Sequence, residues 1–142
     1  MQEQVAQDDY VLIRYGAAPF TSGKMVTDVI RVMKEKGSAV TETPCYQLLG
    51  RKDGYESRNC VDRDKYVQIA CPYGFKYGYL FDIYKRAEEQ GLLDTIEPHT
   101  TSLMYALGDK LNLWYGDQTN IKITTKEDLE MFEGYAIRKY WI

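Results

Sequence analysis

Two short apolar runs on either side of an amphipathic segment constrain the fold of this chain more than any other feature. The run "DDYVLIRYG" is stopped by Gly16 and Pro19, which predicts a buried strand. The segment "AVTET" after Gly37 predicts a second strand, with one helix between the two. Strand, helix and strand in this order predict a βαβ unit with a right-handed crossover, and therefore an α/β fold.

The helix of this unit is expected from Ser22 to Lys36. Thr21 or Ser22 can cap its first turn, and Gly37 stands where helices often end. The apolar residues at helical spacing are Met25, Val26, Val29, Ile30 and Met33. One face of the helix is therefore expected to pack on the sheet.

The stretch from Pro44 to Lys65 departs from this alternation. It has many charges, few apolar residues and a Lys-Asp-Gly turn signal. This composition predicts a hairpin that leaves the main body.

The rest of the chain returns to the α/β pattern. We expect a strand at "YVQIACP", a helix over 75–90, a helix over 100–107, and strands at "LNLWYG" and "IKIT". Thr125 and Asp128 resemble a capping box that opens a last helix. No internal repeat is present, so residues 1–142 are expected to form a single domain.

Length and charge exclude several functions. The chain has 142 residues, 44% of them hydrophobic, which suits one domain of ordinary size. Its net charge of -3 gives no basic field for nucleic acid. No apolar run approaches the roughly 20 residues of a membrane span, so a soluble cytoplasmic protein is expected. Three cysteines without a Cys-x-x-Cys pair, and one histidine, argue against a disulfide framework or a zinc site.

Ligands of open α/β sheets bind beyond the carboxyl ends of the strands. Four loops are expected at such ends: "YGAAPFTS", the excursion after Thr43, "CPYGF" and "GDQTNIKIT". Several carry Thr, Ser or Gly before a helix, where backbone N–H groups can bind an anion. These loops are therefore the expected place of the site.

The motifs in these loops resemble those of one enzyme family. The segments "DDYVLIRYGAAPFTS", "VDRDKYVQIACPYGF" and "TTSLMYALGDKLNLWYGDQTNIKITTKEDLEMFEGY" occur in the order and approximate spacing seen in the methylerythritol-phosphate and ribitol-phosphate cytidylyltransferases. The resemblance begins at Asp9, and "NIKITTKEDLE" is its most specific piece. It implies the C-terminal part of a Rossmann-like nucleotidyltransferase sheet, with residues 44–65 as a protruding β-arm exchanged in a homodimer.

The resemblance also implies a reaction. In the complete enzyme the phosphate of a phosphorylated polyol or sugar attacks the α-phosphorus of CTP and pyrophosphate leaves, with Mg²⁺ expected as cofactor. The family's Gly-rich loop, which wraps the triphosphate, has no counterpart here, so the chain resembles the C-terminal half only. Alone it is expected to be inactive, because little stabilises the developing charge. A cut domain, a split gene and a stand-alone remnant all fit the sequence.

The acceptor pocket departs from the family pattern. Where that pattern has His-Asp and then Arg before Pro-Phe, this chain has Arg14, Tyr15 and Ala18. Further polar family positions fall on Gln47, Leu48, Cys71, Pro98 and His99. An unpaired buried polar group costs on the order of 1 to 3 kcal/mol, so these changes imply either a different acceptor or none, with a polyol or sugar phosphate of polysaccharide synthesis as one candidate.

Three charged residues are the main site candidates. The resemblance places Lys122 beside the phosphates as the catalytic cation, although alternation along "NIKIT" alone would make it part of a solvated face. Arg51 matches the basic residue of the arm that grips the substrate phosphate. Asp117 is the candidate metal ligand, because hard cations take carboxylate oxygens, and a Gly-Asp turn explains it equally well.

Four further residues are candidates for substrate binding. Arg14 could replace a lost cation or form a structural ion pair. Cys71 is expected at a strand end near the acceptor, where a small buried thiol is the simpler interpretation. Thr100 and Thr101 could bind a phosphate or serve as helix N-caps. Asn120 is interpreted as a turn residue.

Two non-catalytic functions remain open from the sequence. The chain could be a dimerising or partner-binding module derived from a cytidylyltransferase, in which the arm is kept and the active site is lost. It could also be a carbohydrate-binding domain that uses its 13 tyrosines.

Overall fold

The computed structural model describes residues 5–97 and 99–140 of the chain. Its elements are β1 (Tyr10–Ile13), α1 (Gly23–Lys36), β2 (Ser38–Pro44), β3 (Leu49–Gly50), β4 (Cys60–Val61), a 3-10 turn η1 (Arg63–Lys65), β5 (Val67–Lys76), α2 (Tyr77–Glu89), α3 (Thr100–Ala106), β6 (Leu113–Tyr115) and α4 (Lys126–Tyr140).

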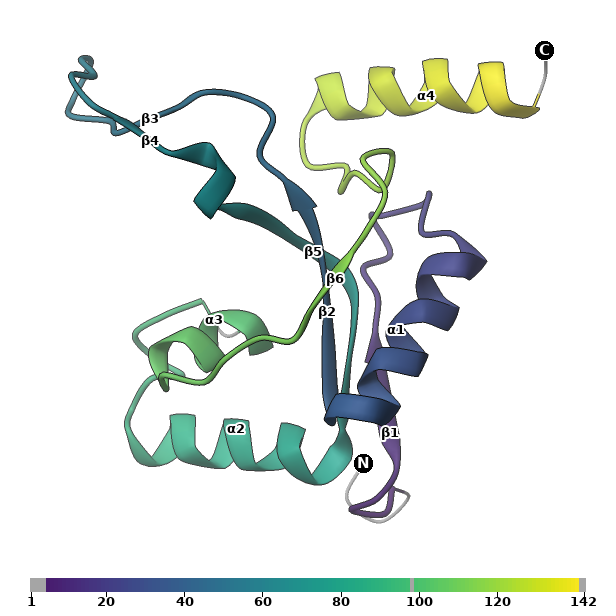
Figure 1. Ribbon diagram of the computed structural model, residues 1–142, viewed down its shortest axis with the longest axis vertical. Coiled ribbons are helices and arrows are strands. Elements are labelled where there is room, and N and C mark those ends of the chain that lie inside the picture. Colours follow the sequence, from purple (N-terminus) through teal and green to yellow (C-terminus); the bar gives the residue numbers. More distant parts are fainter. Residues whose placement is uncertain (1–4, 98, 141–142) are drawn as a thin grey trace.

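The central sheet is mixed and has the strand order β1-β5-β2-β6. Strand β5 runs antiparallel to both of its neighbours, and β2 pairs with β6 in parallel. The strands β1, β2 and β6 therefore point one way and β5 points the other. Helix α1 covers one face of the sheet, and α2 with α3 covers the other (Figure 1).

This arrangement confirms the α/β class and modifies the expected βαβ unit. Strands β1 and β2 are parallel and joined by α1, but β5 is inserted between them. The prediction that "CPYGF" is a loop at a carboxyl end is wrong, because these residues belong to β5. The next helix accordingly begins at Tyr77, two residues later than expected.

Local signals define α1 as the sequence predicts. The Ser22 hydroxyl accepts a hydrogen bond from the Met25 backbone N–H, and Gly37 ends the helix at a φ of 81°. The buried residues of α1 are Met25, Val29, Val32 and Met33. A Cβ on Gly74 of β5 would lie 2.5 Å from the Met33 sulfur, so the glycine lets α1 pack closely against the sheet.

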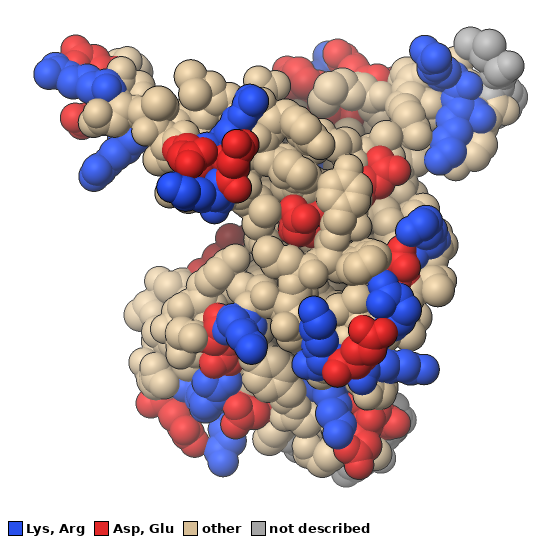
Figure 2. Space-filling view, in the orientation of Figure 1, with Lys and Arg blue, Asp and Glu red and all other residues tan. Residues whose placement is uncertain are grey.

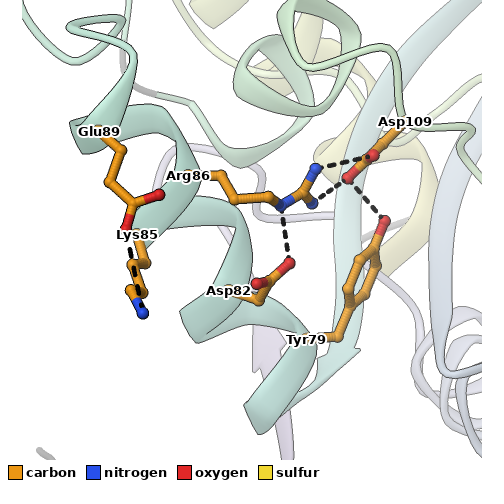
Figure 3. A network of polar contacts seen from close by, with 6 residues as sticks. All are labelled: Tyr79, Asp82, Lys85, Arg86, Glu89 and Asp109. Carbon is orange, nitrogen blue, oxygen red and sulfur yellow. Dashed lines mark hydrogen bonds and ion pairs between the residues drawn. The ribbon is translucent and has the colours of Figure 1, made fainter.

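A polar network fastens α2 to the segment after α3 (Figure 3). Asp109 accepts two hydrogen bonds from the guanidinium of Arg86, at 2.6 and 3.2 Å, and a third from the Tyr79 hydroxyl at 3.1 Å. Arg86 also donates to Asp82 at 2.7 Å within α2. The Arg86 guanidinium holds the pKa of the Asp109 carboxyl below its ordinary value. Since α2 and α3 close one face of the core, this network stabilises that face.

The excursion forms a hairpin, as predicted. Leu49 pairs with Val61 and Gly50 with Cys60, and Gly54 occupies the tip with a φ of 57°. Residues 50–60 are exposed throughout, and the hairpin projects from the body of the molecule (Figure 1). We call residues 44–65 the arm; its exchange in a homodimer stays a prediction.

The prediction of a strand at "IKIT" is wrong. Residues 121–124 have no ladder; the Ile123 N–H donates instead to the Ala17 carbonyl at 2.8 Å. The Asp128 carboxylate accepts from the backbone N–H groups of Thr124 and Thr125, both at 2.9 Å, and turns the chain into α4. The predicted capping box is thereby confirmed, because the Asp128 N–H also donates to the Thr125 hydroxyl at 3.2 Å.

Helix α4 stands apart from the rest of the fold (Figure 1), and none of its residues is buried. Its main aromatic contact is Phe20, whose ring lies 4.7 Å from that of Phe132 and 4.6 Å from that of Tyr135. Within the described chain, no helix is both long and apolar enough to span a bilayer.

Candidate functional site

Loops from three strands meet around one concave pocket of about 330 Å³. Tyr15 follows β1, Thr43 lies near the end of β2, and Asp117 follows β6. Because β5 is antiparallel, its first half reaches the same end and contributes residues 68–71. The pocket thus lies beyond the carboxyl ends of the parallel strands, where the sequence predicts a site.

Asp117 and Thr119 form a hydrogen-bonded turn in the loop that follows β6. The Asp117 carboxylate accepts from the backbone N–H and the hydroxyl of Thr119, at 2.8 and 2.9 Å. These bonds, the backbone one first, hold the pKa of Asp117 below its ordinary value. Asp117 therefore presents a carboxylate at the pocket, as a turn residue that is also accessible to a ligand.

Asn120 does more than the turn role that the sequence suggests. Its side-chain amide donates to the Cys71 carbonyl at 2.5 Å, and its amide oxygen accepts from the Thr21 hydroxyl at 2.9 Å. Asn120 lines the pocket, is only 8% exposed and joins its own loop to two other segments of the chain. Sequence reasoning missed this role; the one available signal was the Asn in the most specific motif.

Lys122 lies at this pocket and is exposed. Its ammonium nitrogen is 5.1 Å from the centre of the Tyr15 ring. Among residues 5–97 and 99–140 no carboxylate lies within ion-pair distance of this nitrogen. Its positive charge is therefore available to an anion in the pocket.

The lining of this pocket offers one carboxylate, that of Asp117, to a metal ion. The described part of the chain holds no cluster of three or more His, Cys, Asp or Glu side chains suited to a metal ion. Mg²⁺ is commonly bound through one or two carboxylates together with substrate phosphates and waters. Asp117, the acidic residue that lines the pocket, could supply the one carboxylate that such a site requires from this chain.

The other predicted residues lie at different distances from this pocket. Cys71 lines it, but in the middle of β5 rather than at a strand end, and it is 2% exposed. Arg14 is outside the pocket lining and donates to the Ala18 carbonyl at 3.1 Å. Arg51 lies on the arm, in a separate hollow with Lys52 and Arg58.

Thr100 and Thr101 are buried at the start of α3. The Thr100 hydroxyl lies 3.1 Å from that of Tyr84, and neither threonine lines the pocket. The prediction that a threonine caps α3 is wrong, because the cap position belongs to His99, without a side-chain bond. Substrate binding by Thr100 and Thr101 stays a prediction.

Charges on the face shown in Figure 2 are mixed in sign, and the arm carries both. This distribution suits a small anion held at one cation better than a long polyanion. A three-layer α/β domain with such a pocket at its strand ends has the architecture of the α/β proteins that bind ligands in a crevice beyond the carboxyl ends of their strands.

Comparison with known proteins identifies the family of this chain. Residues 2–138 match the sequence profile of 2-C-methyl-D-erythritol 4-phosphate cytidylyltransferase (IspD), and the chain belongs to this family. It is 31% identical over 140 residues to ribitol-5-phosphate cytidylyltransferase of Lacticaseibacillus paracasei, covering 98% of this chain and 60% of that protein. It is 30% identical to the 2-C-methyl-D-erythritol 4-phosphate cytidylyltransferase of Bacillus cytotoxicus, covering 94% and 58%.

Solved structures of this family have the same fold as this chain. The 2-C-methyl-D-erythritol 4-phosphate cytidylyltransferase of Thermus thermophilus superposes with a TM-score of 0.80 at 29% identity, covering 89% of this chain and 61% of that one. The Francisella tularensis enzyme gives 0.82 at 20% identity, which supports the fold alone. The chain spans about 60% of the length of these relatives.

Proposed function

We propose that this chain forms one wall of the active site of a cytidylyltransferase that transfers CMP from CTP to a phosphorylated polyol or sugar. The observation that carries the proposal is Lys122, a cation at a concave pocket beyond the parallel strand ends with no carboxylate partner among the residues that the structure describes. In this role its ammonium group binds phosphate oxygens and stabilises negative charge that develops during transfer. Family membership supplies the reaction class.

Other residues of the pocket have supporting roles in this proposal. Asp117 presents its carboxylate to a divalent ion bound with the nucleotide; such an ion, when bound, neutralises phosphate charge. Asn120 keeps the Lys122 loop in place through its bonds to Cys71 and Thr21. Arg51 grips the acceptor's phosphate from the arm of a second subunit, because within one chain it lies in a different hollow.

The acceptor differs from methylerythritol phosphate in this proposal. Tyr15 lies at the pocket where the family pattern has Asp, and Ala18 replaces an Arg. A pocket that loses a carboxylate and a guanidinium loses charged hydrogen bonds that discriminate between polyols. The seat for the triphosphate is expected from residues outside this chain, so the chain alone is inactive.

Calorimetry with CTP and Mg²⁺ tests the proposal. The chain is titrated alone and after mixing with the N-terminal 40% of the Lacticaseibacillus paracasei relative, and CDP-ribitol formation from ribitol 5-phosphate is followed in parallel. We expect nucleotide binding only by the mixture, and its loss in Lys122→Ala. Lys126→Ala is the matched control, because Lys126 pairs with Glu130 on α4. Absence of nucleotide binding by a mixture that forms a stable complex would contradict the proposal.

A further inference from the structure

Lys122 would be expected to sample many positions, because an exposed lysine has a flexible four-carbon stem. In the structure its ammonium nitrogen lies over the face of Tyr15, 5.1 Å from the ring centre. This distance is within the roughly 6 Å range of cation–π attraction. A ring attracts the ammonium group without neutralising it, whereas a carboxylate at the same place would pair with it.

The Tyr15 ring is itself fixed from behind. Its hydroxyl lies 3.1 Å from the hydroxyl of Tyr73, and the two rings meet edge to face at 5.9 Å and 82°. Tyr73 is a core residue of β5 with 3% exposure. The imidazole of His99 lies 6.0 Å from the Tyr15 ring on the side of α3. The orientation of Tyr15 is therefore set by the core.

The two loops that carry Tyr15 and Lys122 are also held together by the backbone. The Ile123 N–H donates to the Ala17 carbonyl at 2.8 Å, one residue beyond Lys122 and two beyond Tyr15. This bond keeps the stem of Lys122 alongside the ring.

We propose that Tyr15 is a positioning residue for Lys122: its ring holds the ammonium group over the pocket with its charge intact, and Tyr73 holds the ring. The inference rests on the proposed function for the ligand of Lys122, an anion such as a phosphate. It goes beyond that function by assigning the preorganisation of the cation to an aromatic pair. An aromatic seat limits the directions from which Lys122 can be approached, so an anion must enter from the side opposite the ring.

Reductive dimethylation with ¹³C gives each lysine an NMR signal while keeping its charge. Ring currents should move the Lys122 methyl signal upfield of exposed lysines such as Lys126, and a nuclear Overhauser effect should connect it to the Tyr15 ring protons. Lys122→Arg assigns the signal by its loss. Lys139 is the internal control, because its nitrogen lies 5.5 to 5.7 Å from the rings of Phe20, Tyr135 and Tyr140.

Variants separate the ring from the hydroxyl. In Tyr15→Leu the Lys122 signal should return to the position of exposed lysines, whereas in Tyr15→Phe it should stay upfield; the Lys139 signal should stay upfield in both. A wild-type Lys122 signal at the exposed position, without the Overhauser effect, overturns the proposal, and this measurement needs no variant to fold. An unchanged signal in folded Tyr15→Leu also overturns it.

Inorganic pyrophosphate distinguishes this inference from the proposed function. Addition of pyrophosphate to the mixture with the N-terminal part should shift the Lys122 signal further if Lys122 binds phosphates. A ring-shifted signal that does not respond to pyrophosphate contradicts the proposed function and leaves the positioning role supported. A Lys122 signal that responds to pyrophosphate but shows no ring-current shift supports the proposed function and contradicts the positioning role of Tyr15.

Discussion

The side-chain amide of Asn120 donates to the backbone carbonyl of Cys71 at 2.5 Å, although 49 residues separate them in the chain. This bond ties the loop of Lys122 to the middle of β5. It makes the geometry of the pocket depend on a buried amide rather than on the turn that contains it.

Asn120→Ala is expected to lower the free energy of unfolding by about 1 to 3 kcal/mol, because the Cys71 carbonyl and the Thr21 hydroxyl lose buried partners. Thermal and urea unfolding measure the change. Gln118→Ala is the neighbouring control, since Gln118 is exposed and makes one long bond of 3.5 Å. Equal stability of the two variants would show that Asn120 is only a turn residue.

Asp109→Ala should destabilise the protein by about 1.5 to 3 kcal/mol, because Arg86 and Tyr79 lose a charged acceptor. The effect should depend on pH. The folded pKa of Asp109 lies below its ordinary value of 3.8, so the carboxylate contributes its full stability above that pH. This contribution is lost as the pH falls through the folded pKa, and the unfolding curves of the two proteins should converge there. A constant difference down to the most acidic measurable pH would contradict this prediction.

Asp128→Asn should weaken the start of α4. The bonds from Thr124 and Thr125 lower the pKa of Asp128 from 3.8 to about 2, so its capping contribution is present above pH 3.8 and disappears as the pH falls toward 2. Amide hydrogen exchange should become faster in the first turn of α4 and stay unchanged in α1. Glu130→Gln, two residues further along the same helix, is the control. Unchanged exchange near residue 128 would rule out the capping role.

Removal of the arm should abolish dimers if the predicted exchange takes place. Pro44 and Val67 are paired in the β2–β5 ladder, so a short Gly-Ser turn can replace residues 46–64 without disturbing the sheet. Analytical ultracentrifugation should find a dimer for the intact chain and a monomer for the shortened one, while Lys122→Ala stays dimeric. A monomeric intact chain, or a dimeric shortened chain, would contradict the prediction.

Local patterns predicted a large part of the fold. The cap of α1 at Ser22, its end at Gly37 and the capping box of α4 all depend on residues within three or four positions of one another, and all three are confirmed. The hairpin of the arm was likewise visible from its turn signal and charge. For the site, the strand-end rule together with the "NIKIT" motif pointed to Lys122 and Asp117, which do lie at one pocket.

Errors arose where alternation was taken as a sufficient sign of a strand. "IKIT" alternates as a strand does, but Asn120 is buried in bonds to other segments and Asp128 captures the following N–H groups. The segment therefore has no strand partner. The length of β5 was underestimated because proline and glycine were taken as sufficient signs of a loop. Pro72 and Gly74 both lie within the strand.

The sequence by itself determined the caps of α1 and α4, the projecting arm, the α/β class and the family resemblance, because each depends on neighbours along the chain or on motif order. Only the tertiary structure decided that β5 runs antiparallel between β1 and β2, that Asn120 joins three segments, and that Lys122 lies on the ring of Tyr15. Those contacts join residues as far as 99 positions apart, and their partners are chosen by how the chain reverses and packs. No spacing rule within a single helix or strand encodes that choice.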